Sequence, residues 1–268
     1  MAASPDSVVD VLVERSTDKR GVVTLTLNRP DAFNALSEAM LDALHESIDA
    51  AGADETTRVI IIAAKGRAFC AGHDLKEMRA QPSDEYYQRL FDRCGRLMMA
   101  IQTVKVPVIA QVEGIATAAG CQLVAMCDLA VAASSARLAV SGVRLGLFCS
   151  TPSVALSRNM PRKFAFEMLL TGEFMDAATA MQHGLINRVA ADGEVAEEVE
   201  SLVSAIVDKP AVAIRTGKAL FYRQLEQPIA EAYADAAHTM ACNMMADDAL
   251  EGVQAFIEKR SPTWSKGS

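Results

Sequence analysis

The sequence predicts an α/β domain that ends in a helical region, and three observations support this prediction. Over the first 195 of the 268 residues, short β-branched or apolar runs alternate with amphipathic helical segments. One run, 58–64 (RVIIIAA), is apolar almost throughout, as expected for a parallel strand covered on both faces. After residue 195 the helix formers Ala, Glu, Met and Leu dominate. We therefore expect a core, residues 1–195, followed by a C-terminal helical region, residues 196–268.

Each element is expected from a local signal, taken here in chain order. Strands are expected where β-branched or apolar residues are concentrated, at 8–15, 22–28, 58–64, 107–112 and 128–132. Ser37 and Ser83 are expected to cap helices, the second of which runs to about residue 102, because apolar residues follow each serine at helical spacing. A loop is expected at 65–73. The apolar faces of the C-terminal helices need a partner, so oligomerisation and pocket closure are expected of the segments 197–208, 211–225, 229–246 and 249–260.

The composition argues against several classes of function. With a formal net charge of −8 and a pI near 5.1, a broad nucleic-acid surface is not expected. No apolar run approaches the roughly 20 residues that cross a bilayer, and the acidic N-terminus lacks the features of a leader peptide, which predicts a cytoplasmic protein without a membrane partner. The six cysteines form no CxxC pair and no Cys/His metal spacing, so buried reduced thiols and no metal are expected.

Two segments could form a binding or catalytic site. The first is 69–77 (FCAGHDLKE), which follows the strand expected at 58–64. Gly72 permits a sharp turn and a close approach of the backbone to a ligand. Backbone N–H groups exposed in that turn can donate hydrogen bonds to an oxygen, and Lys76 is placed to meet a phosphate. An ordinary strand-to-helix turn with Asp74 as the helix cap explains the same residues equally well.

The second segment is 113–123 (EGIATAAGCQL), which follows the strand expected at 107–112. Small residues at the start of a short helix leave N–H groups without partners, at the positive end of the helix dipole. Such a helix end can stabilise negative charge that develops on an oxygen. Close packing on small side chains accounts for the same residues without any such role.

Together, the two segments resemble the motifs of the crotonase (enoyl-CoA hydratase/isomerase) superfamily. The resemblance is carried by F-C-A-G-x-D-L-K-E, followed about forty residues later by G-x-A-x-A-A-G-C-x-L, and it continues in LNRP at 27–30, LTGE at 170–173 and AFIEKR at 255–260. It covers the chain from about residue 11 to residue 264. The sequence resembles one subgroup more closely, the enoyl-CoA hydratase domain-containing protein 3 group, in GHDLKE at 72–77 and GLFCSTP at 146–152.

The resemblance implies a fold, an assembly and a chemistry. The family fold is a crotonase-like spiral of ββα units with a helical C-terminal region, assembled as a homotrimer or a dimer of trimers. Its chemistry is polarisation of a coenzyme A thioester carbonyl by two backbone N–H groups, an oxyanion hole that stabilises an enolate without a further cofactor. By position the two donors are His73 and Ala119, where Ala119 replaces the usual glycine. The imidazole of His73 could in addition act as an acid or base.

The resemblance also implies a path for the coenzyme A part of an acyl-CoA substrate. By position, that path involves residues of the first segment and of the C-terminal helix, which can belong to a neighbouring subunit: Ala71, His73, Asp74, Leu75, Lys76, Phe256 and Lys259.

The sequence departs from the family at three carboxylate positions. Hydratases position and activate water with two glutamates, whose places are taken here by Gln122 and Gly142, and the aspartate of dienoyl isomerases is replaced by Ser150. General acid–base groups contribute roughly 10²–10⁴-fold each, so hydration is expected to be weak. An amide can still hold a water or a substrate group, so Gln122 remains a candidate site residue. No spacing argument selects a substitute from Glu77, Glu85, Tyr86, Glu113 and Cys149.

Three functions therefore remain open. The first is an enzyme of fatty-acid or related acyl-CoA metabolism that uses the oxyanion hole with a non-standard base or none, since decarboxylation and thioester hydrolysis depend less on paired glutamates. The second is a non-catalytic acyl-CoA-binding or regulatory protein. The third is a plain enoyl-CoA hydratase. Arg144 could bind an anionic acyl group or form a structural salt bridge.

Overall fold

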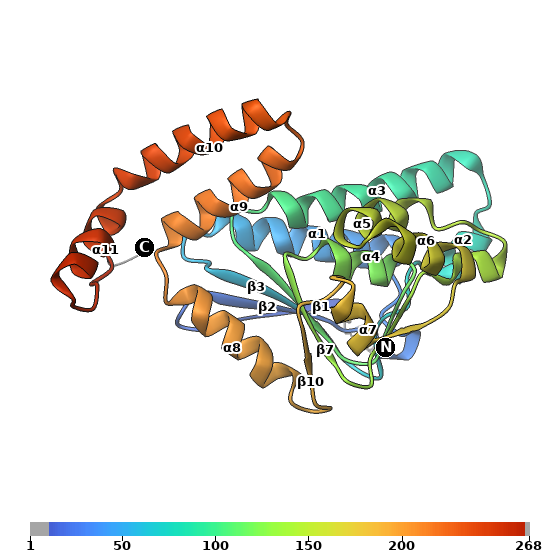
Figure 1. Ribbon diagram of the computed structural model, residues 1–268. Coiled ribbons are helices and arrows are strands. Elements are labelled where there is room, and N and C mark those ends of the chain that lie inside the picture. The colour runs from blue at the N-terminus through green and yellow to red at the C-terminus, as the bar shows by residue number, and fades with distance from the viewer. Residues whose placement is uncertain (1–10, 266–268) are drawn as a thin grey trace, which may run out of the picture.

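The chain winds through strand–strand–helix units that build two sheets (Figure 1). The structure, a computed structural model, describes residues 11–265. In three successive units the first strand joins the larger sheet and the second strand joins the smaller one. These strand pairs are β3 (Val59–Ala64) with β4 (Ala68–Cys70), β5 (Val108–Val112) with β6 (Ile115–Thr117), and β7 (Leu129–Ala133) with β8 (Arg137–Ala139). The expected α/β spiral of ββα units is confirmed.

The larger sheet has six strands in the order β1-β2-β3-β5-β7-β10, where β1 is Val13–Thr17, β2 is Val22–Leu27 and β10 is Arg188–Ala190. β1 and β2 are antiparallel and the remaining neighbours are parallel. The smaller sheet has the order β4-β6-β8-β9, with β9 (Met175–Asp176) antiparallel to β8. The first five residues of β3 are buried, because helices cover both faces of the larger sheet, as its apolar sequence predicts.

The helices around the sheets begin where the sequence places capping residues. α1 (Glu38–Ala53) begins after Ser37, whose side chain accepts a hydrogen bond from the Met40 N–H at 3.2 Å. α3 (Asp84–Thr103) begins after Ser83, which accepts from the Tyr86 N–H at 3.2 Å. Both predicted caps are confirmed. The other elements of the core are η1 (Pro30–Ala32), α2 (Leu75–Ala80), α4 (Ala119–Met126), η2 (Ser141–Leu145), α5 (Ser150–Asn159), α6 (Arg162–Thr171) and α7 (Ala177–Gln182).

None of the four strands of the smaller sheet was expected, and neither was β10 of the larger sheet. The predicted loop 65–73 contains β4, and the small-residue segment 114–121 contains β6 before α4 begins. Both strands have only three residues, and they pair with each other across more than forty positions of sequence, so no local alternation marks them. The strand expected at 8–15 begins at Val13 within the described residues, and its residues 8–10 lie outside them.

The four predicted C-terminal helices are present as α8 (Val195–Val207), α9 (Ala211–Leu225), α10 (Ile229–Met244) and α11 (Asp247–Glu258). α8 packs against strands of the larger sheet, whereas α9 to α11 form an arm that projects away from it (Figure 1). α10 has no buried residue. Large apolar side chains of the arm are exposed, among them Phe221, Leu225, Tyr233, Met240 and Met245.

A polar network joins the arm to the core. The buried Lys218 of α9 forms an ion pair with Asp128 at 2.6 Å and donates to the carbonyls of Ile101 and Val106. Tyr222 donates to the second oxygen of Asp128 at 2.7 Å. Burial lowers the pKa of Lys218, and the negative charge of Asp128 opposes this effect. The position of α9 therefore depends on a buried charge pair as well as on apolar packing.

Candidate active site

The two small-residue segments meet at a cavity of about 260 Å³. His73, in the turn between β4 and α2, and Ala119, the first residue of α4, both line this cavity. The rest of its wall is mainly apolar and comes from the residues next to the two segments' turns, from α2 and α3, and from η2, α5 and the loop between them: Ala71, Leu75, Met78, Phe91, Ala118, Ser141, Gly142, Leu145, Leu147, Phe148, Cys149, Ser150, Thr151 and Pro152.

The backbone around His73 is fixed by a short parallel bridge to Leu36. The Leu36 N–H donates to the Gly72 carbonyl at 2.8 Å, and the Asp74 N–H donates to the Leu36 carbonyl at 3.3 Å. Because N–H groups alternate in direction along an extended chain, the His73 N–H is directed away from Leu36. Gly72 has a φ of +88°, and a Cβ atom there would lie 2.9 Å from the Ala118 Cβ and 3.2 Å from the Ala119 nitrogen. The two segments are thus in contact beside both candidate donors.

The start of α4 is held by hydrogen bonds that leave Ala119 available. The Ala118 N–H donates to the Ala139 carbonyl at 2.9 Å, and the Gln122 N–H donates to the Ala118 carbonyl at 3.0 Å. Within residues 11–265, the N–H groups of His73 and Ala119 donate to no other residue. Two backbone donors without acceptors therefore occur at one cavity, and one of them lies at the positive end of a helix dipole.

Backbone strain at this site falls on Ala118. Its φ of 52° and ψ of −122° lie in a region that glycine adopts readily and alanine rarely. Such conformations cost on the order of 1–3 kcal/mol and persist where the surrounding structure enforces them. Ala119, the position at which the alanine replaces the usual glycine of the family, is the first residue of a helix and carries no such strain. The replacement of glycine at position 119 is thus compatible with the backbone, and the conformational strain of this turn lies at Ala118.

The imidazole of His73 also belongs to the cavity wall. Both ring nitrogens are buried, and neither makes a hydrogen bond to a described residue. The ring contacts Phe91 of α3 edge-on, with 5.5 Å between ring centroids. Burial lowers the pKa of His73, an effect that the nearby Leu36 carbonyl opposes. The imidazole is therefore neutral at neutral pH and has one nitrogen that can accept a proton.

The loop after η2 occupies the space that a side chain at position 142 would need. A Cβ atom added at Gly142 would lie 2.5 Å from the Leu147 carbonyl oxygen and 2.6 Å from the Cys149 sulfur. The buried Cys149 thiol thus lies where the second hydratase glutamate would begin, and burial raises the pKa of this thiol. Among the described residues that line the cavity, none carries a carboxylate.

The structure places Gln122 beside a different cavity. Gln122 is 4 % exposed, and its Oε1 is buried without a hydrogen-bond partner among the described residues. It lines a hollow of about 610 Å³ between α1, α3, α4 and α5, next to Met98, Met126 and Val154. Among the described residues, Thr151 alone lines both this hollow and the cavity of His73. Gln122 lies one turn after Ala119 on α4 but lines the neighbouring hollow and not the cavity of the two candidate amides.

The residues expected along the coenzyme A path are divided between two ends of the chain. Ala71 and Leu75 line the cavity, and the Lys76 side chain is exposed beside them. Asp74 caps α2 by accepting from the Lys76 and Glu77 N–H groups, and it forms an ion pair with Arg29 at 2.8 Å. Phe256 and Lys259 lie at the end of α11, and Figure 1 shows α11 at the opposite end of the molecule from α2. One chain alone does not bring them together.

Several other sequence candidates lie outside the cavity wall. Glu77, Glu85, Tyr86 and Glu113 do not line it. Arg144 forms an ion pair with Glu173, which supports its structural interpretation. Five cysteines are buried, as expected, whereas Cys242 is exposed. Sequence reasoning did not single out Phe91 or Met78, whose helical spacing is the same as that of ordinary core residues.

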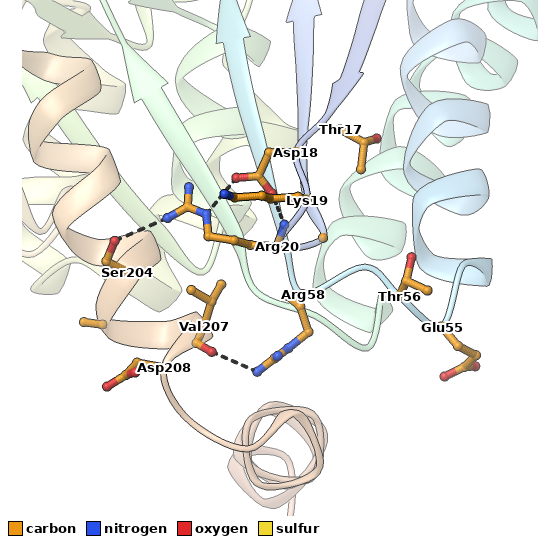
Figure 2. A pocket seen from close by; sticks show the side chains of 12 residues that line it. Thr17, Asp18, Lys19, Arg20, Glu55, Thr56, Arg58, Ser204, Val207 and Asp208 are labelled. Carbon is orange, nitrogen blue, oxygen red and sulfur yellow. Dashed lines mark hydrogen bonds and ion pairs between the residues drawn. The ribbon is translucent and has the colours of Figure 1, made fainter. Parts of the chain in front are cut away.

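A larger, polar hollow of about 1060 Å³ lies near the amino ends of β2 and β3 (Figure 2). Two of its arginines form contacts with neighbouring residues. Arg20 pairs with Asp18 at 2.8 Å and with Glu200 of α8, and Arg58 donates to the Val207 and Lys209 carbonyls at the end of α8. These contacts join the β1–β2 turn to α8, and this structural role accounts for the residues present.

Two further features of residues 11–265 limit the possible functions. No group of three or more His, Cys, Asp or Glu side chains is arranged to hold a metal ion. No helix in this part of the chain has the length and apolar character to cross a membrane.

Comparisons with known proteins agree with the fold and the motifs. A family model described as enoyl-CoA hydratase/isomerase matches residues 17–267. The rat protein enoyl-CoA hydratase domain-containing protein 3, mitochondrial, is 44% identical over 263 residues, which are 98% of this chain and 87% of the relative. The crystal structure of human enoyl-CoA hydratase domain-containing protein 3 has a TM-score of 0.91 and 42% identity, covering 94% of this chain and 100% of that one.

An enoyl-CoA hydratase structure from Mycobacterium smegmatis is similar as well, with a TM-score of 0.93 and 64% identity over 94% of this chain and 98% of that chain. The resemblance in the motifs is therefore confirmed over nearly the whole sequence, including the resemblance to the domain-containing protein 3 group. This chain belongs to the enoyl-CoA hydratase/isomerase family.

Proposed function

We propose that this protein binds an acyl-CoA thioester and stabilises its enolate between the backbone N–H groups of His73 and Ala119. The observation that carries the proposal is the pair of N–H groups without acceptors beside one cavity. A thioester carbonyl oxygen between two such donors becomes more negative as an enolate forms, and the donors then bind it more strongly. The pathway would be fatty-acid or related acyl-CoA metabolism.

The reaction that follows is one that does not depend on paired carboxylates. The wall of the cavity carries no carboxylate within the described residues, and the glutamate positions hold Gln122 and Gly142. Hydration would therefore lose the roughly 10²–10⁴-fold that each acid–base group supplies. Isomerisation, decarboxylation or thioester hydrolysis would need the oxyanion hole more than it needs those groups. A non-catalytic acyl-CoA-binding protein is the alternative that the same absence supports.

The coenzyme A part of the ligand would pass Ala71, Asp74 and Leu75, with Lys76 near a phosphate. Phe256 and Lys259 would reach it from another subunit, because α11 of the same chain lies at the far end of the molecule (Figure 1). Phe256 is 85% exposed in the single chain. The exposed apolar side chains of α9 and α10 support assembly as a homotrimer or a dimer of trimers. Light scattering after size exclusion tests this assembly.

The experiment compares the affinity of the protein for butyryl-CoA with its affinity for S-butyl-CoA, a thioether that lacks the carbonyl oxygen. Two backbone hydrogen bonds, each contributing about 0.5–1.5 kcal/mol, predict roughly 5–150-fold tighter binding of the thioester. Ala119→Pro removes one donor, and proline is well tolerated at the first position of a helix. This variant should reduce the preference for the thioester without changing affinity for the thioether. Ala119→Gly keeps the N–H group and is the matched control.

The possible results separate the hypotheses. Equal affinity of the wild-type protein for both ligands would contradict the oxyanion hole, and no affinity for either would contradict the ligand class. A panel of acyl-CoA substrates then tests catalysis, where loss of one donor should cost about 10²–10³-fold in turnover. Binding without turnover across the panel would favour the non-catalytic alternative. Fast hydration of crotonyl-CoA that persists in Gln122→Ala would instead support a plain hydratase.

A further inference from the structure

We propose that the side chain of His73 is the proton-transfer group of the cavity and moves a proton at the α-carbon of the bound acyl group. This inference rests on the proposed function, in which the backbone of the same residue holds the thioester oxygen. His73 would then have two separate tasks: its N–H group stabilises the enolate, and its imidazole exchanges the proton whose removal creates that enolate.

The composition of the cavity wall supports this role of the imidazole. Among the described residues that line it, only the His73 imidazole and the Cys149 thiol titrate, since the rest are aliphatic, aromatic, hydroxyl or glycine residues. Burial keeps the Cys149 thiol protonated at neutral pH, so it has little capacity to accept a proton. The imidazole is neutral under the same conditions and can accept one.

The environment of the ring nitrogens supports the same role, because the one backbone group that acts on the ring is the Leu36 carbonyl, and it makes no well-formed hydrogen bond to either nitrogen. A buried polar atom without a partner costs free energy, and folded proteins rarely leave both nitrogens of an imidazole in this state. In His73 both are buried without a hydrogen bond to a described residue. A structural histidine would make a well-formed hydrogen bond to a carbonyl or a side chain, whereas this ring only lies near the Leu36 carbonyl and lines the cavity.

The position and rigidity of the ring also support proton transfer by His73. The oxyanion donor and the imidazole belong to one residue, so the backbone that fixes the thioester oxygen also fixes the base near the adjacent α-carbon. The edge-on contact with Phe91 restricts the ring from the α3 side, and Tyr87 stacks on Phe91 at 6.3 Å between centroids. The groups that act on the ring, namely Phe91 and the Leu36 carbonyl, carry no charge, and neither does the Cys149 thiol of the same cavity wall at neutral pH.

The step balances without a co-reactant. One imidazole nitrogen takes the α-proton, the electron pair of the Cα–H bond forms the carbon–carbon double bond of the enolate, and the negative charge moves to the thioester oxygen. The imidazolium then returns a proton to the α-carbon, or to the γ-carbon where the substrate has a suitable double bond. Exchange of the ring proton with solvent between these two events introduces a solvent hydrogen into the product.

The test is deuterium exchange into the α-position of butyryl-CoA in D₂O, followed by mass spectrometry. His73→Gln keeps the backbone N–H group and replaces the ring with an amide that cannot take a proton. We expect the exchange rate to fall by at least about 100-fold, while the affinity for butyryl-CoA changes by less than about twofold because uniform binding is retained. In His73→Ala, added imidazole should restore part of the exchange, which a purely structural role of the ring would not predict.

Two results would overturn the inference and leave the proposed function in place. One is wild-type protein that binds butyryl-CoA with a preference over S-butyl-CoA but exchanges no deuterium. The other is His73→Gln that exchanges at the wild-type rate, or Cys149→Ser that loses the exchange while His73→Gln retains it. Failure of the wild-type protein to bind butyryl-CoA would instead show that the proposed function itself is wrong.

Discussion

Replacing Gly142 with alanine should destabilise the protein, because the loop that follows η2 has filled the space for a side chain. A Cβ atom there would approach a backbone oxygen, that of Leu147, to 2.5 Å and the Cys149 sulfur to 2.6 Å. Backbone must therefore move, and overpacking of this kind costs about 1–3 kcal/mol. The lower entropy of the unfolded alanine chain offsets about 0.4–1 kcal/mol of this cost. Taken at the middle of both ranges, the net loss is about 1 kcal/mol, which corresponds to a melting temperature lower by roughly 2–4 °C.

The assay is urea denaturation at equilibrium, together with thermal unfolding. Gly95→Ala is the matched control, because a Cβ atom at Gly95 meets nothing within 4 Å and the residue lies inside α3. There the substitution should raise the free energy of unfolding by about 0.5–1 kcal/mol. Gly142→Glu, which restores the glutamate of the hydratases, should destabilise more than Gly142→Ala. A Gly142→Glu protein that is as stable as the wild type and hydrates crotonyl-CoA rapidly would refute the reasoning.

Three further predictions follow from the strained, charged and titrating residues. Ala118→Gly should raise the free energy of unfolding by about 1 kcal/mol in urea, since relief of the strain at its φ of 52° exceeds the entropy cost of glycine; a lower stability would show that the strain is not real. Asp128→Ala should lower the free energy of unfolding by about 3–5 kcal/mol, because the buried Lys218 loses its counter-charge. A loss below about 1 kcal/mol would show that the ion pair contributes no more than an exposed surface pair. The α-exchange rate should rise with pH as His73 loses its proton, at an apparent pKa below the ordinary value of a histidine, and should be flat from pH 7 to 8. A rate that keeps rising to pH 9 would indicate a different base.

Much of the fold could be predicted from local signals. Ser37 and Ser83 mark helix starts because a serine side chain replaces a backbone acceptor that the first turn lacks, and this effect is local. The strand at 58–64 is marked by its unbroken apolar run. The strands β4 and β6 carry no comparable signal, because they are stabilised by each other across the spiral and by the residues that pack on them.

In the candidate site, too, some features could be predicted from local sequence and others depend on tertiary packing. The meeting of His73 and Ala119 at one cavity could be predicted, since motif spacing assigns both backbone positions. The side chains that surround them could not, because Phe91 and Cys149 reach the cavity only through tertiary packing. The strain at Ala118 and the loop over Gly142 are likewise properties of the folded backbone. That Gln122 lines the neighbouring hollow and not the cavity of His73 also depends on tertiary packing.

In the proposed function two backbone N–H groups hold the oxygen of a coenzyme A thioester, and the vibration of that carbonyl reports on both hydrogen bonds. Infrared difference spectra of butyryl-CoA labelled with ¹³C at the carbonyl would be recorded free and bound to the protein. Two donors in a water-excluded cavity should polarise the bond and move its stretching band to lower frequency on binding, and Ala119→Pro should reverse part of that shift. A band that stays at its aqueous position in the bound complex would contradict the account.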